Sequence, residues 1–181
     1  MGTPSVDLEA PTRRLRFLFV AVLVLALTVG ARSAGAAIIV TVDGAGGMRP
    51  GMDVAAVESL LGVALRIDRL YTGNPCGTAT FRTPGVEGYA LFFGSRLASL
   101  WFEQGVRTGR GIRIGSTVAA LRRAYPNLRS RPDAYTPGAR NLFFRRPEAP
   151  HWRLRFDVSQ GRRVTRIAFG NDTVFLTEGC A

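Results

Sequence analysis

The sequence predicts an α+β protein made of two tandem repeats, each with short helices packed on one face of an antiparallel β-sheet. Two observations carry this prediction: a short pattern occurs twice, and runs of β-strand character follow each copy. The copies, residues 47–57 and 111–121, lie 64 residues apart and agree at six of eleven positions. Self-similarity at a fixed spacing is typical of a duplicated supersecondary unit. We therefore expect repeat one over residues 37–104 and repeat two over residues 105–181.

Each copy of the pattern predicts the start of a short helix. Asp53 can cap the first helix and Gly62 can end it. Ser116 or Thr117 can cap the second, and Pro126 ends it. The glycines of the pattern favour tight turns into the helix, since the lysine and hydroxyl residue of a phosphate-binding loop are absent. The residues expected to face inward are Val54, Val57, Leu61, Val118, Leu121 and Tyr125.

Strands are expected after each helix, in the form of an antiparallel meander. Gly94-Ser95 and Gln160-Gly161 have the composition of hairpin turns. The Pro/Arg-rich stretch 129–140 is predicted to be a loop between helix and sheet. The predicted strands are 77–83, 89–93 and 97–102 in repeat one, and 141–145, 152–158, 164–169 and 174–176 in repeat two.

The helix starts resemble those of a known superfamily. Gly51-Met-Asp-Val-Ala-Ala-Val57 and Gly115-Ser-Thr-Val-Ala-Ala-Leu121, with an antiparallel sheet and a terminal Cys180, look like the β-lactamase inhibitory protein superfamily. The same unit resembles small outer-membrane assembly lipoproteins that carry one copy. This resemblance implies two units, each a helical hairpin with a sheet, whose open sheet face binds another protein. The chain departs from the inhibitor in having one cysteine per repeat, and no inhibitory residue can be matched to a position here.

The N-terminal segment has the order of a secretory signal peptide. Arg13, Arg14 and Arg16 precede an apolar run over residues 17–29, and Ala34-Gly35-Ala36 follows as an A-x-A cleavage site. A run of this length is too short for a bilayer core of about 30 Å. We expect residues 1–36 to be removed and the mature protein to be secreted or otherwise extracytoplasmic. The alternative is an uncleaved anchor that extends to Val40.

Cys76 and Cys180 are the two cysteines of the chain, one in each predicted repeat. In an exported protein an even pair favours a disulfide, which here would tie the end of repeat two to repeat one. The alternative, a metal site, would need more ligands than two distant thiols and His151, the single histidine.

Alternation along the strands separates a core face from an open face. Leu100 and Phe102 match Ile167 and Phe169 as core residues, which leaves Trp101 open. Trp152, Leu154 and Phe156 are expected to point inward, away from Arg153, Arg155 and Asp157. Aligning residues 91–93 with residues 154–156 places Phe92 in the position of Arg155. The predicted binding face therefore holds Phe92, Trp101, Arg153, Arg155 and Arg166, residue types enriched at binding hot spots. The alternative is that a helix or loop buries Phe92 and Trp101.

Positive charge is concentrated in repeat two. Residues 37–104 hold five arginines and six acids, whereas residues 105–166 hold fifteen arginines and three acids, a net charge of +12. Such asymmetry favours an anionic partner, because a surface potential steers association. All 24 basic residues are arginine, so a high-GC coding bias is the alternative explanation. Export and the lack of a nucleic-acid-binding motif argue against nucleic acid.

Catalytic patterns are weak in this chain. The sequence contains no nucleophile-elbow pattern with which His151 could form a catalytic triad, and its acids form no convincing glycosidase-like pair. Cys76 is expected to be in a disulfide. We expect no catalytic residues, no cofactor and no metal. The leading interpretation is a secreted, non-catalytic, protein-binding module of the tandem-repeat inhibitor type, with another secreted or envelope protein, potentially an acidic one, as partner. The alternative is a cell-envelope factor that binds a polyanion or membrane surface through repeat two; otherwise membrane contact is expected only through the signal segment.

Overall fold

The computed structural model describes residues 2, 37–69, 71–149, 151–176 and 180. The expected signal segment lies outside these residues, apart from Gly2. Within the described part of the chain, no helix has the length and apolar character needed to cross a membrane.

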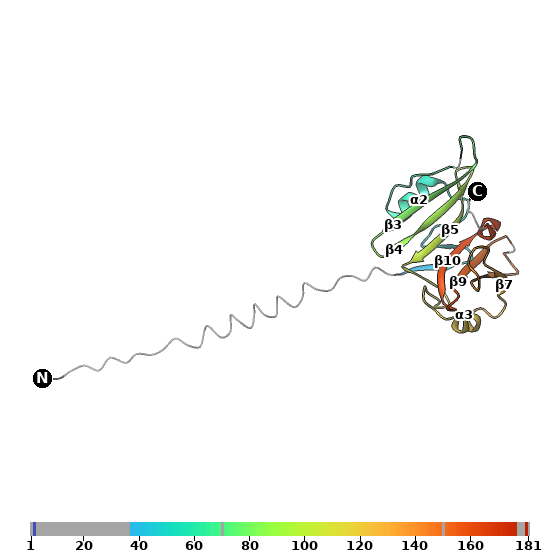
Figure 1. The fold of residues 1–181 in the computed structure, drawn as a ribbon. Coiled ribbons are helices and arrows are strands. Elements are labelled where there is room, and N and C mark those ends of the chain that lie inside the picture. The colour runs from blue at the N-terminus through green and yellow to red at the C-terminus, as the bar shows by residue number, and fades with distance from the viewer. Residues whose placement is uncertain (1, 3–36, 70, 150, 177–179, 181) are drawn as a thin grey trace. The chain divides into compact units, whose positions relative to one another are not determined.

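The described chain is mostly β-sheet with two short α-helices, which is compatible with the predicted α+β class (Figure 1). A seven-stranded antiparallel sheet has the order β3-β4-β5-β10-β9-β8-β7. Its strands are β3 (Cys76–Thr83), β4 (Val86–Phe93), β5 (Arg96–Gln104), β7 (Arg129–Pro132), β8 (Arg140–Arg145), β9 (Arg153–Val158) and β10 (Val164–Gly170).

A second, three-stranded sheet has the order β2-β1-β6 and was not predicted. It contains β1 (Ile38–Thr41), β2 (Gly44–Ala45) and β6 (Val106–Thr108). β1 and β6 run parallel, with Ile38 opposite Val106. This small sheet therefore joins the start of the first half to the start of the second.

Both predicted helices are present, with the predicted caps. Helix α2 (Val54–Leu61) begins after Asp53, whose carboxylate accepts from the Ala56 N–H at 2.8 Å, and it ends at Gly62 in the left-handed conformation. Helix α3 (Val118–Ala124) begins after Thr117, whose hydroxyl accepts from the Ala120 N–H at 3.2 Å. These side chains satisfy backbone donors that a helix start leaves unpaired.

The main core lies on one face of the large sheet. Val57 and Leu61 of α2 and Val118 and Leu121 of α3 belong to the same buried cluster as the inward side chains of the strands. The predicted core residues Leu100, Phe102, Ile167 and Phe169 are fully buried there, with Leu154 and Phe156. Both helices thus contribute to one continuous apolar core.

Two predicted segments have a different structure. Residues 129–132, expected in a loop, form the edge strand β7, and residues 174–176, expected to be a strand, overlap the 3₁₀-helix η1 (Asp172–Phe175). β7 contains no apolar residue, so no hydrophobic alternation marks it. The Asn171 side chain accepts from the Thr173 N–H and begins the turn of η1 instead of extending the strand.

The placement of Phe92 on the open face is wrong. Phe92 is fully buried in the main core beside Ala90, whereas Tyr89 lies on the opposite face of β4. The sheet pairs Ala90 with Leu100 and Phe156 with Ile167, and Leu100 matches Ile167 in the predicted repeats. Ala90 is therefore the counterpart of Phe156, where the prediction used Phe93. The predicted alignment of residues 91–93 with residues 154–156 was therefore displaced, and an odd displacement exchanges the two faces of a strand.

Candidate functional site: an arginine-lined pocket at the end of the sheet

The other four residues of the predicted binding face lie on the sheet face opposite the main core. Trp101 and Arg155 are not open, because both are buried, at 3% and 5% exposure. Arg153 and Arg166 are partly exposed. The alternative that Trp101 is covered is therefore the correct one, and Trp101 is not available to a partner as an aromatic anchor.

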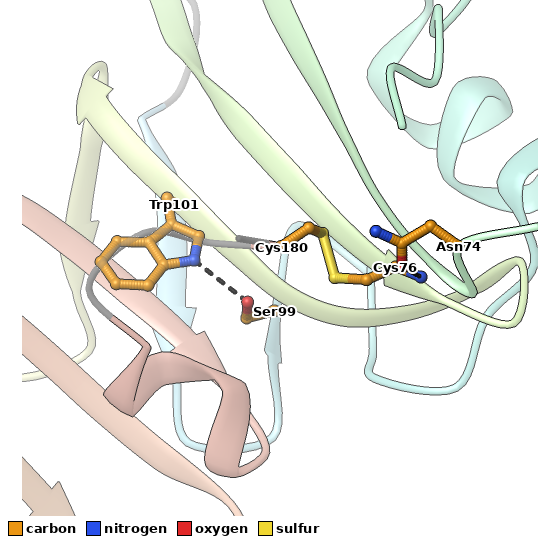
Figure 2. The surroundings of a disulfide bond; sticks show 5 residues. All are labelled: Asn74, Cys76, Ser99, Trp101 and Cys180. Carbon is orange, nitrogen blue, oxygen red and sulfur yellow. Dashed lines mark hydrogen bonds between the residues drawn. A yellow bond between two sulfur atoms is a disulfide. The ribbon is translucent and has the colours of Figure 1, made fainter. Parts of the chain in front are cut away.

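Trp101 is held in a layered cluster of rings and charges. Its indole stacks on the Tyr89 ring at 5.3 Å between centroids, and the Arg155 guanidinium carbon lies 4.6 Å from the Trp101 ring centroid. The indole N–H donates to the Ser99 hydroxyl at 3.0 Å (Figure 2). A buried indole with its N–H satisfied stabilises the fold.

Arg155 connects this cluster to the C-terminal segment. Its Nε donates to the Asp157 carboxylate at 2.6 Å, and its Nη1 donates to the carbonyls of Val174 and Leu176 at 2.8 and 3.1 Å. A buried arginine with these partners is a structural residue that secures η1 against the sheet. Its assignment as a binding residue has no support in this arrangement.

Arg166 is the second cation beside Asp157. Its Nε lies 3.4 Å from Asp157 Oδ2, and its Nη1 donates to the Tyr89 hydroxyl at 3.2 Å. Burial alone would lower the pKa of Arg166, but Asp157 and Tyr89 oppose that effect and the pKa is raised. Burial raises the pKa of Tyr89, partly offset by the positive charge of Arg166. Glu103 lies 4.0 Å from Arg166 Nε, so the two acids Asp157 and Glu103 balance the charges of Arg155 and Arg166.

The predicted disulfide between Cys76 and Cys180 is present (Figure 2). Cys76 begins the edge strand β3, and its N–H donates to the Asn74 side chain at 3.0 Å. The bridge joins residues 104 positions apart and therefore links the C-terminal segment to the far edge of the large sheet.

Uncompensated charge gathers instead at the opposite end of the sheet. A pocket of about 690 Å³ opens around β7, β8 and the residues that follow α3. Six arginines line it, and Glu148 is the one acid in its described lining. The arginines are Arg110, Arg129, Arg131, Arg145, Arg146 and Arg153.

Strand geometry brings three of these arginines to one side. Arg129 stands opposite Phe143 across β7 and β8, Arg131 stands opposite Asn141, and Arg145 stands two residues beyond Phe143. Residues directly opposite in an antiparallel pair share a face, and so do alternate residues of a strand. Arg129, Arg131 and Arg145 therefore lie together on the face opposite the main core, and all three are exposed.

Several pocket arginines are fixed in place by neighbours. The guanidinium carbon of Arg131 lies 4.6 Å from the Phe175 ring centroid, and that of Arg153 lies 4.8 Å from it. Arg110 donates to the Ala124 carbonyl at 2.7 Å, at the last residue of α3. Stacking on a ring orients a guanidinium while leaving N–H groups at its edge able to donate.

Acidic partners neutralise only part of this charge. Arg146 pairs with Asp43, and Arg153 pairs with Asp172 at 3.0 Å. Within the described residues, Arg129, Arg131 and Arg145 form no ion pair. The pocket can therefore attract an anion.

Sequence reasoning missed Arg129, Arg131 and Arg145 as site residues. The signal was the excess of arginine in residues 105–166, which located the charge in the correct half but not at particular positions. The first two lie in the stretch predicted to be a loop. Without the strand β7, nothing in the sequence aligns them with Arg145.

No protein-family model and no curated protein matches the sequence. Solved structures to which the chain is similar include the following three. A cysteine-rich secretory protein of Staphylococcus aureus has a TM-score of 0.47 at 13% identity, over 69% of this chain and 45% of that one. An extracellular SCP-domain protein of Bacillus anthracis has a TM-score of 0.47 at 8% identity, over 67% and 44%. A DUF4309 family protein of Bacillus subtilis has a TM-score of 0.45 at 10% identity, over 77% and 91%.

The matched region spans less than half the length of the first two proteins. At these identities and TM-scores, none of the three indicates a function for this chain.

Proposed function

We propose that this chain is an exported, non-catalytic binding protein that holds an anionic partner in the arginine-lined pocket of its second half. The observation that carries the proposal is the group Arg129, Arg131 and Arg145, which is exposed on one side of the pocket and has no ion-pair partner within the described residues. A surface of this kind raises the local concentration of anions and accelerates their association.

The burial of the predicted aromatic anchors favours this site over the sheet face. A protein-binding face needs accessible hot-spot residues, and Phe92 and Trp101 are both buried. The interpretation as a polyanion-binding envelope factor thus has more support than the interpretation as an inhibitor-like module with an aromatic face.

Export is part of the proposal. The apolar run over residues 17–29 with its A-x-A site is typical of a signal peptide, and a disulfide is characteristic of oxidising compartments. A mature chain that starts after Ala36 would carry the whole described fold except Gly2.

We further propose that the two halves are tandem repeats of the kind found in the β-lactamase inhibitory protein superfamily. The sequence matches Leu100 with Ile167 and Phe102 with Phe169, while the sheet pairs Leu100 with Phe169 and Phe102 with Ile167. Each residue thus pairs across the sheet with the counterpart of its neighbour two positions away. This pairing is expected if a local two-fold axis passes between Trp101 and its partner Ala168. Inhibition of a β-lactamase is not part of this proposal, because no inhibitory residue can be matched.

Binding to a generic polyanion tests the proposed function. We expect the purified protein to bind dextran sulfate and to lose affinity steeply as salt is added, because exposed charges are screened. Changing Arg129, Arg131 and Arg145 together to Gln should weaken binding by about tenfold or more, on the scale of charge-assisted contacts.

The matched control changes three exposed arginines that do not line the pocket. Arg113, Arg122 and Arg123, changed together to Gln, remove the same charge elsewhere in the second half. Equal losses in the two triple variants would mean that net charge alone attracts the polyanion, and the pocket would not be the site.

A further inference from the structure

We infer that the arginine-lined pocket recognises clustered phosphoryl groups, as in an oligophosphate or the phosphate groups of a lipid surface. This inference rests on the proposed function and specifies its ligand. The pocket offers several guanidinium groups from separate elements, and phosphoryl oxygens are the acceptors that match such a set.

The charge of the pocket requires a ligand with several negative charges. Six arginines and Glu148 line it, and Asp43 and Asp172 each neutralise one arginine from outside the lining. Within the described residues, three positive charges then remain without an acid to balance them. A single carboxylate would leave most of this charge unpaired, whereas two adjacent phosphoryl groups would neutralise it.

The arrangement of donors favours a tetrahedral anion. Arg129 and Arg131 come from β7, Arg145 from β8, Arg153 from β9 and Arg110 from the turn after β6, so the donors surround the pocket from several elements. A planar carboxylate offers its two oxygens in one plane, which a single guanidinium fork can occupy. A phosphoryl group directs its oxygens to several sides and can accept from two or three arginines at once.

An unpaired donor in the lining provides a second observation. Nε of Arg146 is buried and has no hydrogen-bond partner within the described residues. A buried donor without a partner costs free energy, and this cost is removed when an acceptor reaches it. Arg146 directly follows β8 and lines the pocket, and its guanidinium is already held by Asp43.

The size of the pocket fits a chain of phosphoryl groups. A volume of about 690 Å³ corresponds to roughly twenty water molecules at the liquid density of about 30 Å³ each. A single phosphate ion would fill only a small part of that space. Rings in the lining hold individual guanidinium groups: Arg131 lies against Phe143 and Phe175, and Arg110 lies against Phe144.

Calorimetric titration with three soluble anions at constant ionic strength tests the inference. The probes are inorganic tripolyphosphate, orthophosphate, and butane-1,2,3,4-tetracarboxylate as a polycarboxylate of comparable charge. We expect tripolyphosphate to bind at least about tenfold more tightly than either of the others. The triple variant Arg129→Gln, Arg131→Gln and Arg145→Gln should lose this preference, whereas the triple variant at Arg113, Arg122 and Arg123 should retain it.

A vesicle arm distinguishes the sources of the phosphoryl groups. If phosphatidylglycerol vesicles bind the protein and tripolyphosphate displaces it, lipid headgroups enter the pocket. If such vesicles do not bind while tripolyphosphate does, the ligand is a phosphate chain. Both results support phosphoryl recognition.

Failure of the inference can be told apart from failure of the proposed function. Equal affinities for the tetracarboxylate and tripolyphosphate, with dextran sulfate still bound through the three arginines, would overturn phosphoryl recognition and leave anion binding standing. No binding of dextran sulfate or tripolyphosphate would overturn both. Unfolding midpoints of the two triple variants show whether any loss of binding comes from misfolding, since exposed substitutions of this kind normally change stability little.

Discussion

Trp101 and Arg155 show how a residue that suits an interface can serve the fold instead. Each is a residue type that binding sites favour, and each is buried under η1 and the residues around it. The guanidinium of Arg155 lies over the indole while it donates to the carbonyls of Val174 and Leu176. The pair therefore holds the C-terminal segment on the sheet.

Truncation of Trp101 tests this structural role. Trp101→Ala should lower the free energy of unfolding by about 3–5 kcal/mol, because it leaves a cavity beneath η1 and removes the contacts with Tyr89 and Arg155. Urea denaturation followed by circular dichroism measures the change. Tyr71→Ala, at a ring that is 63% exposed, is the matched control and should change little. A Trp101→Ala protein as stable as the wild type would place the indole at the surface.

At single positions, the sequence predicted faces well where a strand alternates and poorly where it does not. Arg153, Arg155 and Asp157 alternate with Leu154 and Phe156, and all were assigned to the correct faces. Residues 91–93 are three consecutive apolar residues, and Leu91 and Phe92 are both fully buried although they point to opposite faces of β4. Alternation then carries no information, which is why the face of Phe92 was inverted.

At the scale of the element, capping side chains determine where both helices begin. α2 and α3 have only eight and seven residues, so intrinsic propensity contributes little and the caps and the buried face stabilise them. Asp53→Ala should cost about 1 kcal/mol of unfolding free energy, because the Ala56 N–H loses its acceptor. Thermal unfolding measures this loss.

The control for this cap is Asp53→Asn, which keeps an acceptor and removes the charge. Asn should retain most of the stability, since it caps helices about as well as Asp. If Asp53→Asn lowered the free energy of unfolding as much as Asp53→Ala, the ion pair between Asp53 and Arg96, with 3.9 Å from Oδ2 to Nη1, would stabilise the protein more than the cap does.

Elements with an apolar stripe were predictable, and those without one were not. Six of the seven predicted strands and both predicted helices carry inward apolar residues at the expected period. β7 is the opposite case, since its residues are arginines, a serine and a proline at a sheet edge. Its pairing with β8 is a tertiary effect, and it creates the arginine cluster of the pocket. The site was therefore harder to predict than the fold.

At the scale of the whole molecule, the two halves of the chain are connected at two distant points of the seven-stranded sheet. β5 and β10 join the two halves in the middle of the sheet, and the Cys76–Cys180 bridge returns the C-terminal segment to the edge strand β3. Between these points, Arg155 donates hydrogen bonds to the Val174 and Leu176 carbonyls of the same segment. The segment is thus attached both covalently and by buried hydrogen bonds.

Removal of the bridge tests how much the covalent attachment contributes. In the chain-entropy model, closing a loop of about 100 residues restricts the unfolded chain by an amount worth about 4.7 kcal/mol, and the residues joined here are 104 apart. The double variant Cys76→Ser, Cys180→Ser should therefore unfold at a clearly lower denaturant concentration than the oxidised protein. Reduced wild-type protein should match the double variant, because both lack the bridge and keep the Arg155 contacts. Intact mass after alkylation establishes that the wild-type sample is oxidised before unfolding. If oxidised and bridge-free proteins shared one unfolding midpoint, Arg155 and the sheet pairing would be sufficient to hold the segment, and the disulfide would add no stability to the fold.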